Sequence, residues 1–383
     1  MKTKIRYVDL FAGCGGLSYG FQKNDAYEHV VATDIWQAAK DTYDINFPNS
    51  NYILADLGAK SGLQQIITEI PKNLDLLIGG PPCVGFSTLN NSKTESRFNT
   101  LVDQYLNVIE ARLPKIFILE NVKTFRTKKH PSGVCYPEHL KKRIGSFQKG
   151  YTFLELLINA ADFGLAQSRI RYFFIGIRKD CDKKNKMADL LLSEIENQKK
   201  EKPSTLKDAI GDLPNVPVGA GANLLELPDG TKIYNHKSMN HSATLIERLK
   251  HVPKGGGLLD VPSTLLTGHL KGIVSGKYGS GGFVKNIYGR MEWDKPSGTI
   301  IAGMDKITCG RFVHPEEHRL LTPRECARIQ SFPDDFVFTG GIVTQYYLIG
   351  NAVPPKISNI FSSILPKLFE FPTITKSKLL TCN

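Results

Sequence analysis

Short apolar segments alternate with amphipathic stretches through the first 180 residues, and this pattern constrains the fold of the 383-residue chain more than any other feature. The expected strands are residues 7–11, 29–33, 52–54, 74–78, 116–119 and 172–177. Such alternation predicts an α/β fold with a doubly wound, mostly parallel sheet. Ligands bind these sheets at the carboxyl ends of the strands, so the residues that follow each strand are the candidates for function.

The composition is that of a folded, basic protein. Hydrophobic residues make up 41% and charged residues 22%, which argues against disorder. No apolar run reaches the roughly 20 residues that cross a bilayer, and the expected first strand leaves no room for a signal peptide. We therefore expect a cytoplasmic protein without a membrane partner. The net charge of +12 is suited to a polyanionic partner.

The seven cysteines are scattered, and none forms a CxxC pair. This spacing argues against a structural zinc site, and we expect no metal. In a reducing cytosol most of these cysteines are expected to be buried, inert thiols. A cysteine with a catalytic role must therefore stand out by its local setting.

A change in composition marks a domain boundary after the first 180 residues. Residues 179–205 are rich in lysine, and the next hundred residues are rich in glycine and weakly periodic. We predict a catalytic and cofactor-binding domain over residues 1–185, completed by residues 340–383, and a second domain over residues 186–339. Within the second domain, Thr322-Pro323-Arg324-Glu325 predicts a helix start with a capping box, and the helix is expected to stop before Pro333.

Glycines and acidic residues follow the first three expected strands. The turn after the first strand contains Gly13, Gly15 and Gly16, which allow a ligand to approach backbone amides. This spacing is not the GxGxxG of dinucleotide folds. Asp34 follows the second strand, where an acid can bind ribose hydroxyls, and Asp56 follows the third. Together they indicate a nucleoside site.

The later strands end in residues suited to catalysis. Cys83 lies in Gly79-Gly80-Pro81-Pro82-Cys83, where prolines stiffen the turn and the polar, glycine-bounded setting does not fit a buried thiol. Glu120 follows the fifth strand. Arg169 and Arg171 precede the sixth and share one face of an extended segment.

Six blocks in this order resemble the DNA cytosine-5 methyltransferase family. They are DLFAGCGGLSYGF, GGPPCVGFS, ENV, QSRIR, RLLTPRECARIQSFPDDF and IGNAVP, which together span residues 8–355. The resemblance implies a class I S-adenosylmethionine-dependent methyltransferase fold with a smaller target-recognition domain. It further implies double-stranded DNA as substrate, base flipping, and a setting in bacterial restriction–modification with a cognate endonuclease, in the cytoplasm at the nucleoid.

The resemblance also assigns roles to residues of this chain. Cys83 would be the nucleophile that adds to cytosine, Glu120 would hold a proton at ring nitrogen 3, and Arg171 with Arg169 would bind the ring carbonyl or a phosphate. The S-adenosylmethionine pocket would contain Phe11, Ala12, Gly13, Gly15, Gly16, Leu17, Asp34, Ile35, Asp56, Leu57, Pro82, Asn351 and Ala352. The DNA contacts would be Ser87, Arg97, Lys277, Tyr278, Arg290 and Thr299.

Two positions depart from the family pattern. Val84 follows the cysteine where the family has glutamine or asparagine, which removes an amide expected to assist closure of the loop. Asp34 stands where glutamate is commoner and shortens the reach to ribose by one methylene. The reaction expected from the resemblance is unchanged.

Three other functions were weighed against this one. An RNA cytosine methyltransferase would share the catalytic blocks but would not need a recognition region of over 100 residues. A catalytically silent DNA- or cofactor-binding subunit would not need Cys83, Glu120 and Arg171 together. A nicotinamide oxidoreductase does not fit the glycine spacing.

Overall fold

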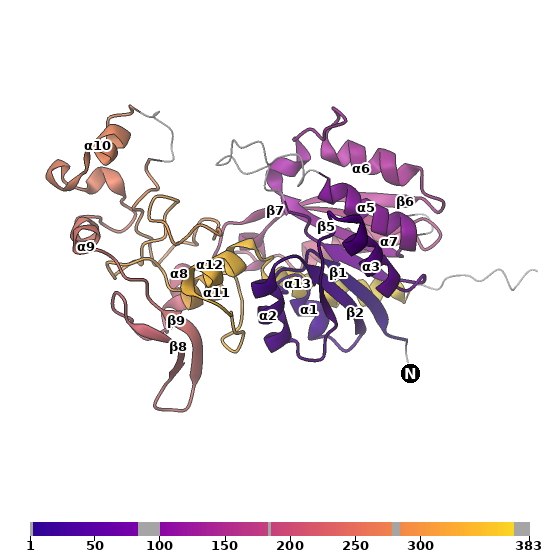
Figure 1. The fold of residues 1–383 in the computed structure, drawn as a ribbon, viewed down its shortest axis with the longest axis horizontal. Helices are drawn as coiled ribbons and strands as arrows, with labels where there is room; N and C mark the ends of the chain where they lie inside the picture. Colours follow the sequence, from indigo (N-terminus) through magenta and orange to yellow (C-terminus); the bar gives the residue numbers. More distant parts are fainter. Residues whose placement is uncertain (1–2, 83–99, 183–184, 278–283, 371–383) are drawn as a thin grey trace, which may run out of the picture.

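The computed structural model describes residues 3–82, 100–182, 185–277 and 284–370. Two lobes lie side by side along the longest axis, joined through the segments around α11 and α12 (Figure 1). The larger lobe contains β1 (Ile5–Leu10), α1 (Tyr19–Gln22), β2 (Tyr27–Asp34), α2 (Gln37–Asn46), β3 (Tyr52–Leu54), α3 (Lys60–Glu69), β4 (Leu76–Gly79), α5 (Leu101–Arg112), β5 (Ile116–Val122), α6 (Tyr136–Gly145), β6 (Tyr151–Asn159), β7 (Ile170–Arg178), α7 (Lys186–Asn197) and α13 (Pro355–Phe369). The smaller lobe contains α8 (Leu206–Ile210), β8 (Gly221–Glu226), β9 (Lys232–Lys237), α9 (Ala243–Lys250) and α10 (Gly268–Val274), with α11 (Pro323–Ile329) and α12 (Ile342–Asn351) at the junction.

The larger lobe is built on a seven-stranded sheet in the order β3-β2-β1-β4-β5-β7-β6. The first five strands in this order are parallel, whereas β7 is antiparallel to both β5 and β6. The predicted α/β fold is confirmed, and all six expected strands are present. The edge strand β6 was not expected from the sequence.

Side chains along each central strand alternate between two helical layers, as the period of two in a β-strand requires. On β1, Ile5 and Tyr7 pack with residues of α13 and α7, whereas Val8 and Leu10 pack with residues of α3, α5 and α6. Continuous apolar strands such as Leu76–Gly79 are therefore buried on both faces.

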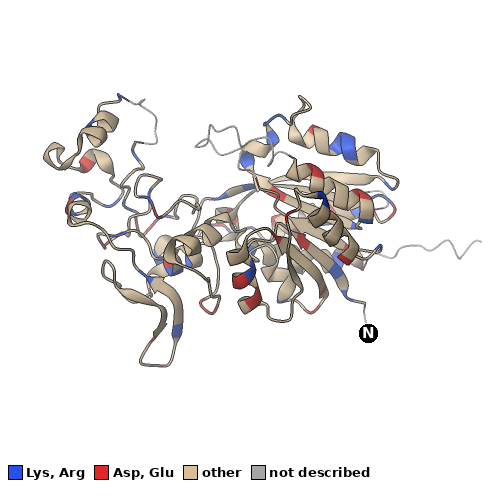
Figure 2. Ribbon diagram, in the orientation of Figure 1, with Lys and Arg blue, Asp and Glu red and all other residues tan. Residues whose placement is uncertain are grey.

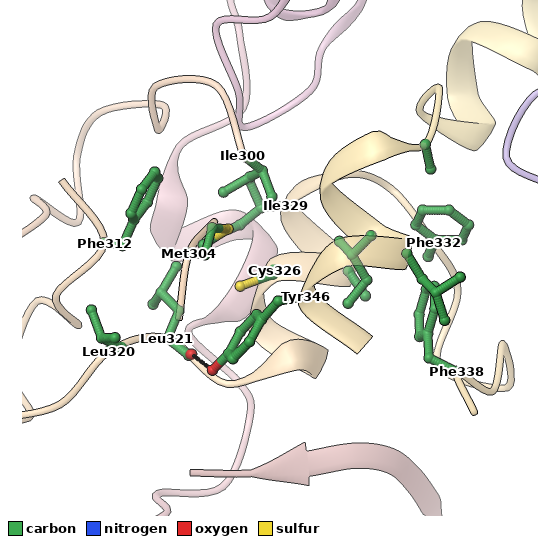
Figure 3. Close-up of a cluster of buried hydrophobic side chains, with 14 of the residues drawn as sticks. Ile300, Met304, Phe312, Leu320, Leu321, Cys326, Ile329, Phe332, Phe338 and Tyr346 are labelled. Atoms are coloured by element: carbon green, nitrogen blue, oxygen red, sulfur yellow. Dashed lines mark hydrogen bonds between the residues drawn. The ribbon is translucent and has the colours of Figure 1, made fainter. Parts of the chain in front are cut away.

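The core of the smaller lobe continues into the larger one. Its buried cluster includes Ile300, Leu321 and Tyr346, and the same cluster reaches Ala39 and Tyr43 of α2. Figure 3 shows part of this cluster around Cys326, where the Tyr346 hydroxyl donates to the backbone carbonyl of Leu321. The two lobes thus share one apolar core along this junction.

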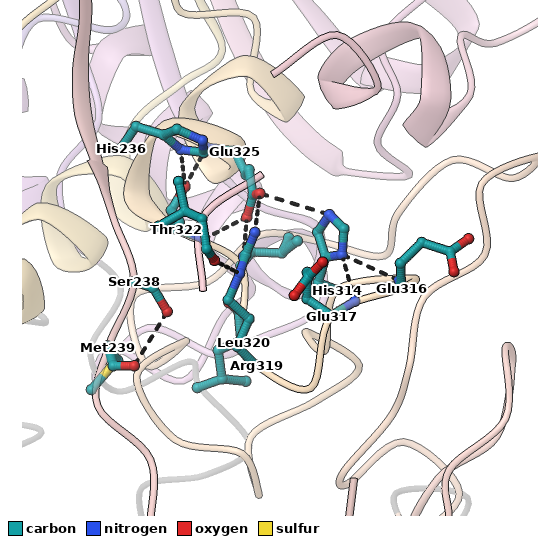
Figure 4. A network of polar contacts seen from close by, with 12 residues as sticks. His236, Ser238, Met239, His314, Glu316, Glu317, Arg319, Leu320, Thr322 and Glu325 are labelled. Carbon is teal, nitrogen blue, oxygen red and sulfur yellow. Dashed lines mark hydrogen bonds and ion pairs between the residues drawn. The ribbon is translucent and has the colours of Figure 1, made fainter. Parts of the chain in front are cut away.

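A buried polar network sets the start of α11. Thr322 caps the helix and Glu325 completes the capping box, as the sequence predicts. The Glu325 carboxylate accepts two hydrogen bonds from Arg319, each at 2.8 Å, and both side chains are almost fully buried (Figure 4). Burial acts to raise the pKa of Glu325 and is outweighed by Arg319, so the pKa lies below its ordinary value.

Lysine and arginine residues are distributed over both lobes (Figure 2). Within the described part of the chain, no helix combines the length and the apolarity that a bilayer crossing needs.

Candidate active site

Glu120 and Arg171 face each other across the antiparallel pair β5 and β7. The Arg171 Nε lies 3.2 Å from the Glu120 Oε1, and the two side chains are only 15% and 12% exposed. Burial raises the pKa of Glu120, although Arg171 and Arg169 act to lower it. A carboxyl group with a raised pKa beside an arginine can hold a proton and stabilise charge at the same place.

The turn after β4 is held against the end of β5. The buried side chain of Asn121 donates from Nδ2 to the Pro81 carbonyl at 3.1 Å. A Cβ added to Gly80 would lie 3.0 Å from the Glu120 Oε2, so glycine gives this turn its close approach to the carboxylate. Cys83, Val84, Ser87 and Arg97 lie outside the described residues.

The turn between β1 and α1 has the backbone that its glycines suggest. Gly13 and Gly15 have φ of +54° and +91°, and Phe11 also lies in the left-handed region at 60°. A Cβ on Gly13 would meet nothing within 4 Å, so the left-handed backbone, and not lack of space, favours glycine there. Phe11, in contrast, is strained, and such strain concentrates at functional sites.

Asp34 and Asp56 lie at the carboxyl ends of neighbouring strands, as expected. The Asp34 carboxylate accepts hydrogen bonds from the amides of Gly13 at 3.1 Å, Ile35 at 2.8 Å and Trp36 at 3.1 Å. Burial raises the pKa of Asp34, while these backbone donors act to lower it. The carboxylate therefore organises the glycine turn. Ile35 beside it is 59% exposed, which leaves an apolar surface at this edge.

The carboxyl-terminal block packs directly on the glycine turn. A Cβ on Gly16 would lie 2.3 Å from the Val353 carbonyl, and the Cys14 thiol lies 3.5 Å from the Leu348 carbonyl. Leu17 and Ala352 are buried in this contact region, whereas Asn351 is exposed. The expected cofactor residues around β1 and α12 are thus brought together, although their ligand is a prediction.

Arg169 is placed differently from Arg171. It is 2% exposed, and its guanidinium donates to the carbonyls of Ile300, Gly350 and Ala352 at 2.7, 3.1 and 2.9 Å. These nitrogens hold backbone, and the expected role of Arg169 at a ring carbonyl or a phosphate stays a prediction.

Arg290 lies in the interior of the smaller lobe, and its expected role at the major groove stays a prediction. It is 3% exposed and donates to the carbonyls of Leu249, Val252, His314 and Glu317. A guanidinium used in this way supports the lobe from inside.

Two other expected DNA contacts, Lys277 and Thr299, lie in the smaller lobe. Lys277 is exposed at the end of α10, and Tyr278 lies outside the described residues. The Thr299 hydroxyl donates to the Ser168 carbonyl at 3.0 Å, across the two lobes.

Two histidines share one carboxylate near the start of α5. The Nε2 atoms of His139 and His130 lie 2.7 and 3.2 Å from the two Asp103 oxygens, and the imidazole rings stack with centroids 3.6 Å apart. If both Nε2 atoms bound one metal ion, the two imidazole rings would point away from that ion, and their centroids would lie further apart than 3.6 Å. The stacked arrangement indicates instead a hydrogen-bonded cluster that ties α5 to the segment after β5 and to α6.

Comparison with known proteins decides the family. The family model described as C-5 cytosine-specific DNA methylase matches residues 5–365. The chain belongs to this family. As a C-5 cytosine-specific DNA methylase it is a DNA (cytosine-5-)-methyltransferase, and use of S-adenosylmethionine follows from the family.

Its relatives include Type II methyltransferases of bacteria. The chain is 33% identical over 370 residues to Type II methyltransferase M1.HphI of Haemophilus parahaemolyticus, covering 95% of this chain and 87% of the relative. It is 32% identical over 394 residues to Type II methyltransferase M.DdeI of Desulfomicrobium norvegicum, covering 96% and 89%. A prophage-encoded E. coli protein described as a DNA modification methyltransferase shares the fold, with TM-score 0.70, 23% identity and coverage of 96% and 99%.

Two polar residues of this methylase were not assigned from its sequence. Asn121 and Gln167 both lie inside the resembling blocks, but a hydrogen bond to a distant backbone leaves no periodic signal. Their position beside Glu120 and Arg169 was the available clue.

Proposed function

We propose that this methylase flips a cytosine out of duplex DNA and methylates its carbon 5 through a covalent adduct with Cys83. The observation that carries the proposal is the pairing of Glu120 with Arg171 at 3.2 Å beside the turn that leads to Cys83. This turn is held by Asn121, so the nucleophile would leave the sheet at a fixed point next to the carboxyl group.

Each protein group would have one task in the reaction. The Cys83 thiolate adds to carbon 6 of the ring, and the Glu120 proton at nitrogen 3 balances the charge that addition creates. The resulting electron-rich carbon 5 takes the methyl group. A base then removes the carbon 5 proton, the bond to sulfur breaks to release the thiolate, and the proton at nitrogen 3 returns to Glu120. Arg171 would stabilise charge on the ring carbonyl.

The glycine turn after β1 and the neighbouring strand ends fit a nucleoside-bearing cofactor. Exposed Ile35 offers an apolar surface for a base, and the open Gly13 leaves backbone accessible. S-adenosylmethionine, when bound, supplies an electrophilic methyl group on sulfur. We propose that it is held by Phe11, Ala12, Gly13, Gly15, Gly16, Leu17, Asp34, Ile35, Asp56, Leu57, Pro82, Asn351 and Ala352. The Asp34 carboxylate would act partly through the turn that it organises.

We further propose that the smaller lobe recognises the DNA target. The helix α7 packs on β6 and α13, so the boundary between the lobes is better set after Asn197 than at residue 186. Ser87, Arg97, Lys277, Tyr278 and Thr299 remain the proposed DNA contacts. A role beside a cognate endonuclease, in the cytoplasm at the nucleoid, is suggested by the named relatives.

Sequencing of DNA from a host that expresses this chain tests the proposal. We expect 5-methylcytosine in one short sequence context, and no methylation with Cys83→Ser. The purified Cys83→Ser protein should still bind duplex DNA but should form no covalent complex on 5-fluorocytosine DNA. Methylation by this variant at the wild-type rate would exclude Cys83 as the nucleophile. Methylation of RNA but not of DNA would exclude the proposed substrate.

A further inference from the structure

Three segments that are far apart in the sequence meet just before β7. Residues 166–169 of the larger lobe form a parallel bridge with residue 297 of the smaller lobe, through Gln167 and Ser297. The Ser168 amide donates to the Ser297 carbonyl, and the Ser297 amide donates to the Ala166 carbonyl, both at 2.8 Å. The third segment, residues 349–352, contains the end of α12 and the residue after it.

Ile300 is held at both of its backbone polar groups. Its amide donates to the Gln167 Oε1 at 2.8 Å, and its carbonyl accepts from the Arg169 Nη1 at 2.7 Å. All three residues are buried, and Ile300 belongs to the core of the smaller lobe (Figure 3). Two side chains of the larger lobe therefore fix the position of the Ile300 backbone in the smaller lobe.

The same two side chains also hold the segment at the end of α12. The Gln167 Nε2 lies 3.2 Å from the Gln330 Oε1, and Gln330 in turn donates to the Ile349 carbonyl. The Arg169 Nη2 donates to the carbonyls of Gly350 and Ala352. A Cβ on Gly350 would lie 2.2 Å from the Ala302 nitrogen, so residues 301–302 and α12 touch backbone to backbone.

Arg171, two residues after Arg169, is the second residue of β7 and contacts the proposed proton site at Glu120. Gln167 and Arg169 precede β7 at a spacing of two residues, and Arg169 and Arg171 line one small cavity together. Gln167 and Arg169 hold Ile300 of the smaller lobe, and Arg171 contacts Glu120 at 3.2 Å. A displacement of Ile300 would therefore act on Arg169, which lies two residues from the Arg171 that contacts Glu120.

We propose that Gln167 and Arg169 are positioning residues that keep residues 297–302 in register with Glu120, and so determine target fidelity. This inference rests on the proposed function of Glu120 and Arg171. Arg169 donates to three backbone carbonyls, and Gln167 bonds Ile300 and Gln330, so these contacts give both residues a positioning role. Their loss would loosen the link between reading the target and methylating it.

The experiment compares Gln167→Met, Arg169→Met and Arg169→Lys with the matched control Arg178→Met. Arg178 lies at the other end of β7 and bonds Leu113 and Asp180. Single-turnover methylation is measured on the target duplex and on duplexes with one base pair changed. We expect the ratio of the two rates to fall about tenfold in both methionine variants, a part of the discrimination available per base pair. Arg169→Lys should recover part of the ratio, and Arg178→Met should leave it unchanged.

Hydrogen exchange of the Ile300 amide supplies a readout that does not depend on activity. In Gln167→Met this amide loses its acceptor, so its exchange should become faster while amides of β1 stay protected. Unchanged protection, or equal losses of rate on correct and altered duplexes, would overturn the proposal. If Arg169→Met does not fold, Arg169→Lys and Gln167→Met carry the test. A wild-type protein that methylates no DNA would refute the proposed function instead. The exchange measurement would still report on the contact of Gln167 with Ile300.

Discussion

Glu120→Gln is the change that most directly tests the proposed proton site. The amide fills nearly the same space and keeps a hydrogen-bond donor, but it cannot give up or take a proton. Glu120 is 12% exposed and lies 3.2 Å from Arg171, so the replacement removes a charged partner from a nearly dry site. Loss of one preorganised group of this kind costs about 10²–10³-fold in kcat.

The pH dependence follows from the raised pKa of Glu120, whose cause is burial. The protonated carboxyl is the form that supports addition to the ring, so kcat should fall as the pH rises through this pKa. In Glu120→Gln this dependence should disappear, because the amide does not titrate. Single-turnover methylation across the pH range, with cofactor affinity measured in parallel by titration calorimetry, gives both quantities.

The result that would refute this reasoning is specific. If Glu120→Gln lowered cofactor affinity as strongly as turnover, the side chain would be structural. If the variant kept the wild-type pH profile, the titrating group would lie elsewhere. Arg178→Lys, at the distant end of β7, serves as the control for general effects on the sheet.

Two further changes test the supports of the site. Asn121→Ala removes the donor to the buried Pro81 carbonyl, and we expect a loss of about 1–3 kcal/mol in the free energy of unfolding together with a lower kcat. Urea unfolding and single-turnover assays measure the two effects. An unchanged kcat would show that the turn needs no such support. Glu325→Gln breaks the buried pair with Arg319 and should lower the free energy of unfolding by about 3–5 kcal/mol. Glu247→Gln, at an exposed pair with Lys250, is the matched control and should show no measurable change.

The sequence predicted the central strands well because they are buried on both faces. Their apolar runs, such as residues 116–119, are bounded by turns and carry an unambiguous signal. The edge strand β6 was missed, since its exposure is mixed along its length and Leu157 is 42% exposed. Its residues lack the clean alternation that marks a half-buried strand.

The site could be predicted where function depends on strand ends, and not where it depends on burial. Glu120, Arg171 and the glycine turn lie where the strand pattern placed them. The family resemblance implied that Arg169 contacts the substrate, and Arg290 was expected at the major groove because it lies in the recognition region and arginine favours guanine. Both bind backbone carbonyls in the interior, and only the packed structure reveals those acceptors.

The packing of α13 on α1 and β1 has a consequence for synthesis on the ribosome. The amide of Gly20 donates to the Ser358 hydroxyl at 2.8 Å, and Ile5 and Tyr7 are buried with side chains of α13. About 350 residues separate the two partners, which corresponds to about 20–70 s at a translation rate of 5–20 residues per second. Throughout this interval one face of the first strand lacks the part of its native cover that α13 supplies. A nascent chain therefore cannot complete its larger lobe before α13 has emerged from the ribosome, and methylation can begin only after that point.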